Sequence, residues 1–470
     1  MGFGLSYVTP ITNLSLSFSG FAFVDDTDLL QMLHHDSSAE EVRTAIQEAV
    51  HHWEGLLAAT AGAIVPEKTF WYLLDFTWQR GDWRYKTIAE CPGDISAKDL
   101  SGEEKIIRRL EADDAAETLG IFLAPSGSRT GQIAKLQGKV LEWVKHISSG
   151  RLSKAEMWTA VQSTILRTLS YPLPAVTLTK QEWEAILSPL LRCVLPRLGI
   201  CRNFPRALVH APSKFFGLDF KHLYTVQEIT RLQGIIIHTA NDTITGRLYR
   251  ASFELLLIEI GSFLPLHLQD FKTVGHLATD SLIKSTWEFL TDHNLQLITD
   301  LKVDLPRQDD CYLLTNIIPL IEDFDHLTQI NRCRLYLRVI FLSDVVDGSG
   351  KELLAAAWNG EWILAPQQIG QWPHQVKPPP SAWTLWKYYL KKTFLGRGLR
   401  LKEPLGPWCA WAIDWPWYFC TDSKSLFHRQ QGTWYRHMLS GQRDNKPSFS
   451  LTGTVSGPPK APHRATVEQR

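Results

Sequence analysis

The sequence has no uninterrupted apolar run of the ~18 to 20 residues that a membrane-spanning helix needs. Its most apolar stretch, residues 253–268, is broken by Glu254, Glu259 and Pro265. Met1 is not followed by a basic segment and an apolar core, so a secretory signal is missing too. We therefore expect an intracellular protein, cytoplasmic or nuclear, with no membrane partner.

Metal-binding cysteine patterns and a net charge are also absent. The seven cysteines form no C-x-x-C motif, and their scatter and odd number favour reduced thiols. The formal net charge is +0, so no overall field attracts a polyanion. Up to Arg129, however, acidic residues outnumber basic ones by roughly ten, and the remainder is basic by about as much. This asymmetry suits a carboxylate site followed by a phosphate-binding surface, but random surface variation explains it equally well.

The composition is that of a globular protein with a substantial core. The 470 residues, 44% of them hydrophobic, are enough for two or three domains. We expect an α+β fold, in which antiparallel palm-like hairpins with a helix precede a mainly helical, thumb-like region and a Trp-rich carboxy-terminal region. The expected divisions are 1–128, 129–265, 266–437 and a disordered tail at 438–470.

Periodicity predicts the elements of the first half. Residues 14–24 read as a strand that enters a core, and residues 39–60 as an amphipathic helix. Segments 70–78 and 83–88 predict a hairpin, and the charged segment 91–116 predicts a loop with some helix. Apolar residues then recur at the helical period, which predicts helices over 131–148, 154–169, 180–197, 219–238 and 243–260.

Predictions for the second half rest on shorter patterns. Residues 332–345 alternate and predict a strand, and the Trp-rich segment 407–419 is too apolar to be exposed. Two Asp–Asp pairs, Asp113–Asp114 and Asp309–Asp310, lie in polar segments, where we expect solvated surface.

A third Asp–Asp pair carries the strongest chemical signal. In FAFVDDTDLL, residues 21–30, an apolar strand delivers Asp25 and Asp26 to a tight turn. Two-metal phosphoryl transfer needs carboxylate oxygens that hold two hard cations about 4 Å apart. Adjacent aspartates are common in ordinary hairpin turns as well. The apolar run directly before this pair favours the metal site.

The segment FVDDTDLL resembles the carboxylate box of reverse transcriptases from non-LTR-like retroelements, which forms the hairpin of the polymerase palm. Residues 59–74, ATAGAIVPEKTFWYLL, resemble the small-residue and Lys segment that follows that box. LGIFLAP, residues 119–125, resembles the hairpin that grips the primer end. Two further segments, Tyr-Pro-Leu-Pro at 171–174 and Phe-Gly-Leu at 216–218, fit retroelement reading frames more loosely.

The resemblance implies an RNA-directed DNA polymerase with catalytic Asp25, Asp26 and Lys68. It also implies Mg²⁺ or Mn²⁺ held by the two aspartates, and an RNA or DNA template–primer as partner. The family carries another metal-binding Asp and its fingers region before the box, whereas only 20 residues precede Phe21 here, none of them acidic. We therefore expect a truncated or degenerate polymerase that is inactive without upstream polymerase sequence.

Two other classes of protein stay open. The chain could be a nucleic-acid-binding protein without catalysis, or an unrelated helical interaction protein whose aspartate turn is accidental. Basic residues in the helical block could follow a phosphate backbone or form a solvated face. The segment 385–402 has six basic residues and no acidic one, so it predicts either a stacking platform for single strands or an amphipathic helix that buries its aromatics. The candidate contact residues are Leu119, Gly120, Arg192, Arg197, Arg202, Lys387, Lys391, Lys392 and Arg397.

Overall fold

The computed structural model divides into two compact units, which are treated separately below. Unit 1 comprises Met1–Tyr7, Leu16–Tyr249 and Asp280–Phe289, and unit 2 comprises Val8–Ser15, Arg250–Thr279 and Leu290–Arg470. The structure describes residues 4–23, 26–33, 37–79, 82–298, 303–347, 349–361, 372–373, 375–407, 409, 417–420, 424–430, 433–443, 446–455 and 463–464.

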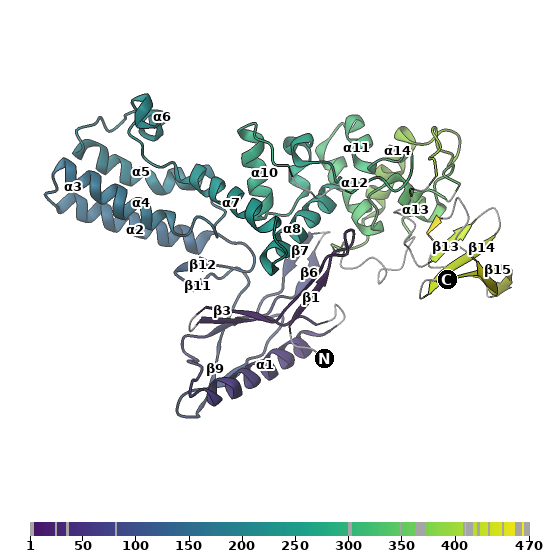
Figure 1. Cartoon of the computed structure of the whole chain (residues 1–470), viewed down its shortest axis with the longest axis horizontal. Coiled ribbons are helices and arrows are strands. Elements are labelled where there is room, and N and C mark those ends of the chain that lie inside the picture. Colours follow the sequence, from purple (N-terminus) through teal and green to yellow (C-terminus); the bar gives the residue numbers. More distant parts are fainter. Residues whose placement is uncertain are drawn as a thin grey trace. The chain divides into compact units, whose positions relative to one another are not determined.

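The first part of unit 1 consists of short paired strands around one long helix, α1 (Ala39–Ala59) (Figure 1). Strands β3 and β4, β6 and β7, β8 and β9, and β11 and β12 pair antiparallel, whereas β5 and β10 pair parallel. The strands are β1 (Leu5–Val8), β2 (Ser15–Phe18), β3 (Gly20–Phe23), β4 (Asp26–Leu29), β5 (Phe70–Tyr72), β6 (Phe76–Gln79), β7 (Asp82–Tyr85), β8 (Ser96–Lys98), β9 (Glu104–Ile106), β10 (Arg108–Leu110), β11 (Ala116–Thr118) and β12 (Ile121–Leu123).

Helix α1 begins where the sequence predicts it. The Ser38 hydroxyl accepts from the Glu41 N–H at 3.2 Å, and the Glu41 carboxylate accepts from the Ser38 N–H at 2.6 Å. This reciprocal capping satisfies two N–H groups that a helix leaves without partners at its start. The helix buries Val50 in a small core with Trp71, Ile95, Ala97 and Ile107. Burial of such side chains holds the short strands to the helix.

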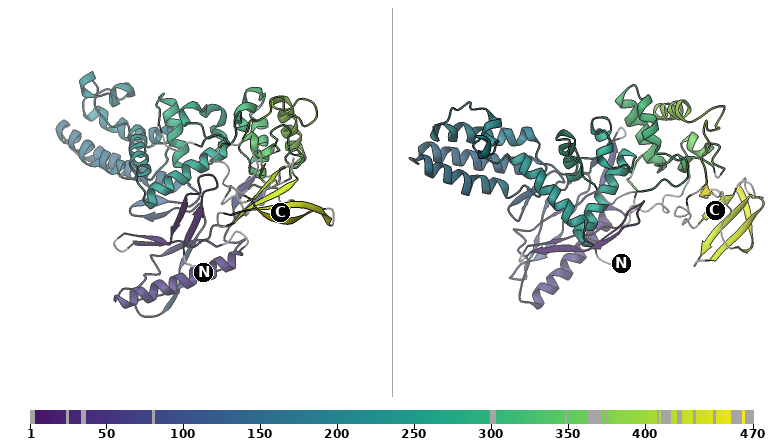
Figure 2. Two further views of the ribbon diagram at one scale, coloured as in Figure 1. Left: turned by 45° about the vertical axis from the view of Figure 1, so that its right-hand side comes forward. Right: turned by 45° about the horizontal axis from the view of Figure 1, so that its top comes forward.

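The second part of unit 1 is helical, and its helices between residues 130 and 197 lie side by side (Figures 1 and 2). The predicted helices are confirmed. One of them, over 154–170, contains a turn of π-helix at Ala160–Ile165, and its buried Met157, Val161 and Leu169 belong to the core of the bundle. The helices of unit 1 are α2 (Thr130–Ser149), α3 (Lys154–Thr159), α4 (Leu166–Ser170), α5 (Lys180–Arg197), α6 (Arg206–His210) and α7 (Leu223–Thr239). The division between the units falls within α8 (Ile244–Ile260) and within α10 (Leu282–Asp292).

A buried polar network connects α5, α7 and α10. Glu228 accepts from Arg231 at 2.7 Å, and both side chains are fully buried. Arg231 also donates to the Ser285 hydroxyl at 3.0 Å. Gln227 accepts from the Trp183 indole N–H at 2.9 Å and donates to Glu228 at 2.9 Å. The helices can therefore pack only in an arrangement that satisfies these groups.

Unit 2 contains short helices and a five-stranded antiparallel sheet of order β16-β15-β14-β13-β17. Buried Arg334 donates to the carbonyls of Ile258 and Glu259, at the carboxyl end of α8, and to that of Val339 at 3.0 Å. The elements are α9 (Phe271–Val274), α11 (Leu313–Ile317), α12 (Phe324–Leu337), α13 (Ala355–Asn359), α14 (Pro380–Thr393), β13 (Trp417–Cys420), β14 (Ser425–Gln430), β15 (Thr433–Arg443), β16 (Lys446–Val455) and β17 (His463–Arg464).

Two predictions of local structure in the second half are wrong. The expected strand at 332–345 is instead the end of helix α12 followed by a short 3-10 helix at Leu342–Val345, and the buried Leu327, Ile330 and Leu337 recur along α12 at helical spacing. Its last residues matched the strand period only over a short window. The expected disordered tail at 438–470 instead contains most of the long β15–β16 hairpin. Its many small polar residues resemble a disordered segment, but the backbone pairing does not depend on them.

Two predictions in the first half are wrong too. The segment 91–116 holds the strands β8, β9 and β10 rather than helix. The apolar run 14–24 enters a core only in part, because Leu16 is 3% exposed whereas Phe21 and Phe23 are 50% and 62% exposed. A continuous apolar run shows that a strand is favoured, but it does not identify what covers each face.

Two expectations concern the whole chain. The seven cysteines all lie among the described residues, and all are free thiols. Within the part of the chain that the structure describes, no helix has both the length and the apolar character to cross a membrane.

The buried ion pair of α7 gives a test of how unit 1 is stabilised. Glu228→Gln leaves the Arg231 cation buried without a counter-charge, so we expect a loss of about 3 to 5 kcal/mol in the free energy of unfolding. Amide hydrogen exchange of peptides from α5 and α7 measures this loss of stability in the helices that contact the ion pair. The matched control, Asp242→Asn in the exposed Arg247–Asp242 pair, should change little. Equal effects of both changes would contradict the assignment.

Candidate functional site

The hairpin of β3 and β4 carries the Asp–Asp pair that the sequence singled out. Phe23 pairs with Asp26 and Phe21 with Asp28, so only residues 24 and 25 separate the paired strands. Asp26 therefore opens β4 next to the turn, whereas Asp25 lies outside the described residues. Residues directly opposite each other in an antiparallel pair share a face. One face of the hairpin thus carries two aromatic rings and two carboxylates, all at least partly exposed.

The second carboxylate, Asp28, was not among the expected site residues. Partial burial and, to a smaller extent, the neighbouring charge of Asp26 raise the pKa of Asp28. The alternation of side chains along a strand predicts this proximity, since residues two apart point the same way. Asp28 approaches the opposite strand closely, because a Cβ on Gly20 would lie 2.2 Å from the Asp28 carbonyl oxygen. A glycine is required at position 20 for this reason.

A divalent cation fits the chemistry of this face in part. Carboxylate oxygens are the ligands that Mg²⁺ and Mn²⁺ prefer, and a cation between Asp26 and Asp28 would relieve their repulsion. Among the residues that the structure describes, no group of three or more His, Cys, Asp or Glu side chains could hold a metal ion. The described residues of this face thus offer two carboxylates, those of Asp26 and Asp28, and Asp25 lies outside the described residues.

Lys68 lies in the turn that leads into β5, where its backbone N–H donates to the Val65 carbonyl at 3.0 Å. The side chain is exposed. Within the described residues, no contact joins Lys68 to Asp26. The structure thus places Lys68 on the surface at a strand start.

Leu119 and Gly120 form the turn between β11 and β12, as the hairpin prediction requires. Both have positive φ, 49° and 78°, which suits the tight turn of a two-residue hairpin. The Tyr171 hydroxyl donates to the Leu119 carbonyl at 2.7 Å, and the Lys135 ammonium donates to the Gly120 carbonyl at 2.7 Å. Two segments that resembled retroelement sequences, 119–125 and 171–174, therefore meet at this turn.

The three basic candidates of the helical block differ in their surroundings. Arg197 donates to the Ser148 carbonyl at 3.1 Å and to the Cys193 sulfur at 3.5 Å, so it holds the end of α2 against α5. Arg192 and Arg202 are exposed, and neither has an ion pair within the described part of the chain. Arg192 and Arg202 thus remain available for a polyanion, whereas Arg197 is partly engaged.

Helix α14 buries its aromatic side chains, which confirms the amphipathic alternative for 385–402. Trp386 and Tyr389 are 0% and 1% exposed, and the Trp386 indole donates to the Ala357 carbonyl at 3.1 Å. Of the four aromatic residues of α14, only Tyr388 is half exposed. Of the four basic candidates, Lys387 lies 5.6 Å from the Trp358 ring, Lys392 pairs with Glu322 at 3.2 Å, and Lys391 and Arg397 are exposed.

The structure overturns the expectation for one of the other Asp–Asp pairs. Asp310 is 6% exposed rather than solvated. Its carboxylate accepts from the N–H groups of Cys311 at 2.8 Å and Ser343 at 3.0 Å. Burial is the main cause that raises the pKa of Asp310 to about 6. An apolar run follows this pair, and its Tyr312 and Leu313 are buried. This run indicates that the pair lies at the edge of a core, although the other flanking residues are polar.

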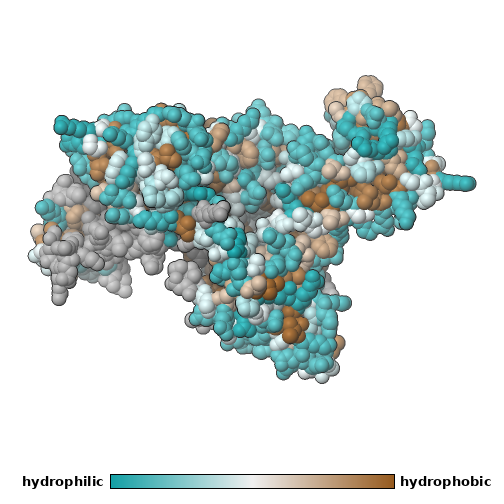
Figure 3. All heavy atoms as spheres, turned by 180° about the vertical axis from the view of Figure 1, so that it is seen from behind, coloured by the Kyte–Doolittle hydropathy of each residue, from teal (hydrophilic) through white to brown (hydrophobic). Residues whose placement is uncertain are grey.

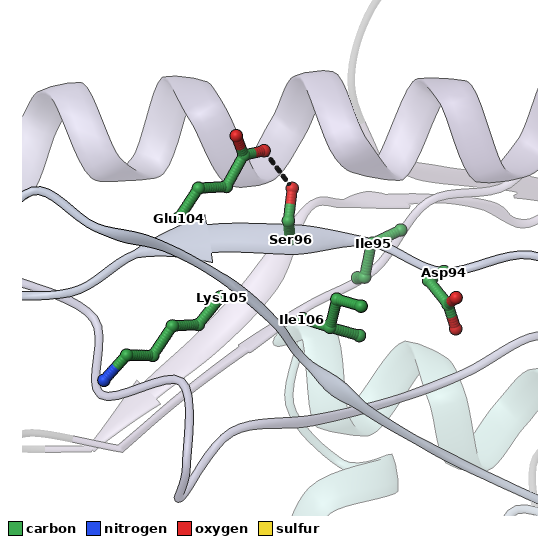
Figure 4. Close-up of a pocket in the computed structure, with 6 residues that line it drawn as sticks. All are labelled: Asp94, Ile95, Ser96, Glu104, Lys105 and Ile106. Carbon is green, nitrogen blue, oxygen red and sulfur yellow. Dashed lines mark hydrogen bonds between the residues drawn. The ribbon is translucent and has the colours of Figure 1, made fainter.

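The pocket drawn in Figure 4 lies beside β8 and β9, and none of the expected site residues lines it. Glu104 accepts from the Ser96 hydroxyl, while Lys105 points away and pairs with Glu67 at 2.7 Å and Asp99 at 2.9 Å. Ser96 and Lys105 are thus engaged with carboxylates. The pocket is lined by Asp94, Ile95, Ser96, Glu104, Lys105 and Ile106.

Comparisons of the chain with protein-family models, with curated proteins and with solved structures gave no match.

The raised pKa of Asp310 makes the stability of unit 2 depend on pH. As the pH rises from about 4 to about 6, the unfolded chain releases this proton before the folded chain does, so stability falls over that window. We expect Asp310→Asn to gain about 2 to 3 kcal/mol relative to the wild type between pH 4 and pH 7.5. Urea denaturation at both values measures it. A difference that does not vary with pH would show that Asp310 titrates normally.

Proposed function

We propose that the chain is a part of a retroelement RNA-directed DNA polymerase, with Asp26 and Asp25 contributing carboxylates to its metal site. The observation that carries the proposal is the position of Asp26, which opens β4 directly after the turn of a β-hairpin. Together with the preceding aromatic and apolar residues, this is the arrangement that the polymerase box requires. The Leu119–Gly120 turn and the helices after it follow in the order that the resemblance implies.

The roles of the residues follow from their chemistry. Asp26 and Asp25 would hold Mg²⁺ or Mn²⁺, and when bound the metal ions would stabilise the charge that develops during phosphoryl transfer. Asp28 adds negative charge to the same face and would strengthen cation binding. Lys68, which is exposed, would meet a triphosphate as a point charge. We infer that the isolated chain is inactive, since two adjacent carboxylates do not complete a two-metal site.

A second candidate is nucleic-acid binding without catalysis. It is favoured by the exposed and unpaired state of Arg192 and Arg202 among the described residues. Exposed Arg side chains neutralise phosphates without reading sequence. Such binding would survive the loss of Asp25 and Asp26, whereas polymerisation would not.

Primer extension on an RNA template with Mg²⁺ tests the polymerase proposal. The chain itself is compared with a version extended upstream from its genomic reading frame, each with Asp25→Ala and with Asp26→Ala. We expect only the extended chain to add nucleotides, and each substitution to reduce its rate more than about 100-fold. Asp113→Ala, taken from an Asp–Asp pair outside the hairpin, is the control and should keep the rate. If the extended chain adds no nucleotide, the polymerase proposal fails and binding becomes the better account.

A further inference from the structure

The segment after α6 presents two phenylalanines to solvent. Phe216 is 95% exposed and Phe215 is 64% exposed. In Figure 3, apolar side chains cap the end of the α6 segment at the upper right, directly above a hydrophilic zone. Aromatic side chains bring a large apolar area out of water when they find a partner. The exposure of these two rings therefore contributes no burial of apolar area to the stability of the helical bundle.

The segment that carries these rings is firmly built. The N–H of Leu218 donates to the Leu208 carbonyl at 2.9 Å, and that of Phe220 to the Val209 carbonyl at 3.0 Å. Val209 and Phe220 are 0% and 2% exposed, so the base of the loop is part of the core of the helical bundle. The tip is thus a fixed projection on a rigid base.

Two backbone features fix the direction of the exposed rings. Phe216 has a φ of 61°, in the left-handed region that non-glycine residues rarely adopt. Its N–H donates to the Ser213 carbonyl at 2.9 Å. At the next position, a Cβ would lie 2.0 Å from the Ala211 carbonyl oxygen, so only Gly217 allows the chain to close here. The loop is strained in order to hold Phe216 outward.

The charge around the rings is mainly positive. Residues 202–221 contain four exposed cations and a single acidic residue, Asp219. The Lys214 ammonium lies 4.9 Å from the centre of the Phe215 ring, so charge and aromatic surface are adjacent. A partner must therefore combine flat apolar faces with negative charge. The four cations are Arg202, Arg206, Lys214 and Lys221.

We propose that this loop binds single-stranded nucleic acid, with a base stacked on Phe216 and phosphates against Lys214 and its neighbouring cations. Stacking on exposed aromatics beside basic residues is how proteins hold single strands without reading sequence. The inference rests on the proposed function, since a polymerase of this kind handles a single-stranded template. It adds a strand-binding element that lies outside the carboxylate hairpin.

Fluorescence anisotropy with a 5′-labelled 20-nucleotide oligothymidine, in buffer without divalent metal, tests the loop. We expect Phe216→Ala to weaken binding by about fivefold or more, and Phe216→Tyr, which keeps the ring, to bind like the wild type. Lys214→Gln should reduce the slope of log affinity against log salt by about one. Leu100→Ala, which removes another exposed apolar side chain of unit 1, should bind like the wild type.

The outcomes separate this inference from the polymerase proposal. If primer extension fails but Phe216→Ala still weakens binding, the loop assignment stands without the polymerase. If Phe216→Ala binds within twofold of the wild type, or if the wild type does not bind at all, the inference is wrong. A change in oligomeric state with unchanged binding would also overturn it and assign the loop to protein contact.

Discussion

The helical part of unit 1 depends on the charged pair inside it. Glu228 and Arg231 are one turn apart on α7, and neither could be buried without the other. Two of the Arg231 nitrogens, Nε and Nη2, have no hydrogen-bond partner within the described residues, so the pair is incompletely compensated. A hydrophobic pair would be as stable or more so. What the ion pair adds is specificity, since only one packing of α5 and α10 satisfies it.

Most helices of unit 1 were predictable, because the signals of a helix lie within its own sequence. Stripes of apolar residues and caps such as Thr179, which accepts from Glu182, define the helices within a few residues. The hairpin turn at Leu119 and Gly120 was equally local. The contact of Tyr171 with that turn joins residues 52 positions apart, and no periodicity encodes it. The presence of this hairpin was thus predictable from the sequence, but the hydrogen bond from Tyr171 that stabilises its turn was not.

The candidate site shows the same limit. Adjacent carboxylates after an apolar strand predicted a hairpin with Asp26 at the turn, and that geometry is present. The position of Asp28 on the same face as Asp26 follows from the alternation of side chains along a strand. The sequence analysis nevertheless named only Asp25 and Asp26, because the carboxylate box that the segment resembles consists of two adjacent aspartates. Burial at Asp310 was missed for a different reason. A polar segment reads as surface unless the apolar residues after it are known to be packed on another element.

Two of the exposed pairs of aromatic rings in unit 1 differ in the charge of their surroundings. Phe21 and Phe23 share a face with Asp26 and Asp28, so a polyanion is repelled there unless a cation is bound first. Phe215 and Phe216 lie among cations, so a polyanion is attracted without help. A strand would therefore be held at the loop independently of metal, and the carboxylate face would engage it only after the metal has bound. Binding and catalysis would then depend on separate residues, which is why the two can fail separately.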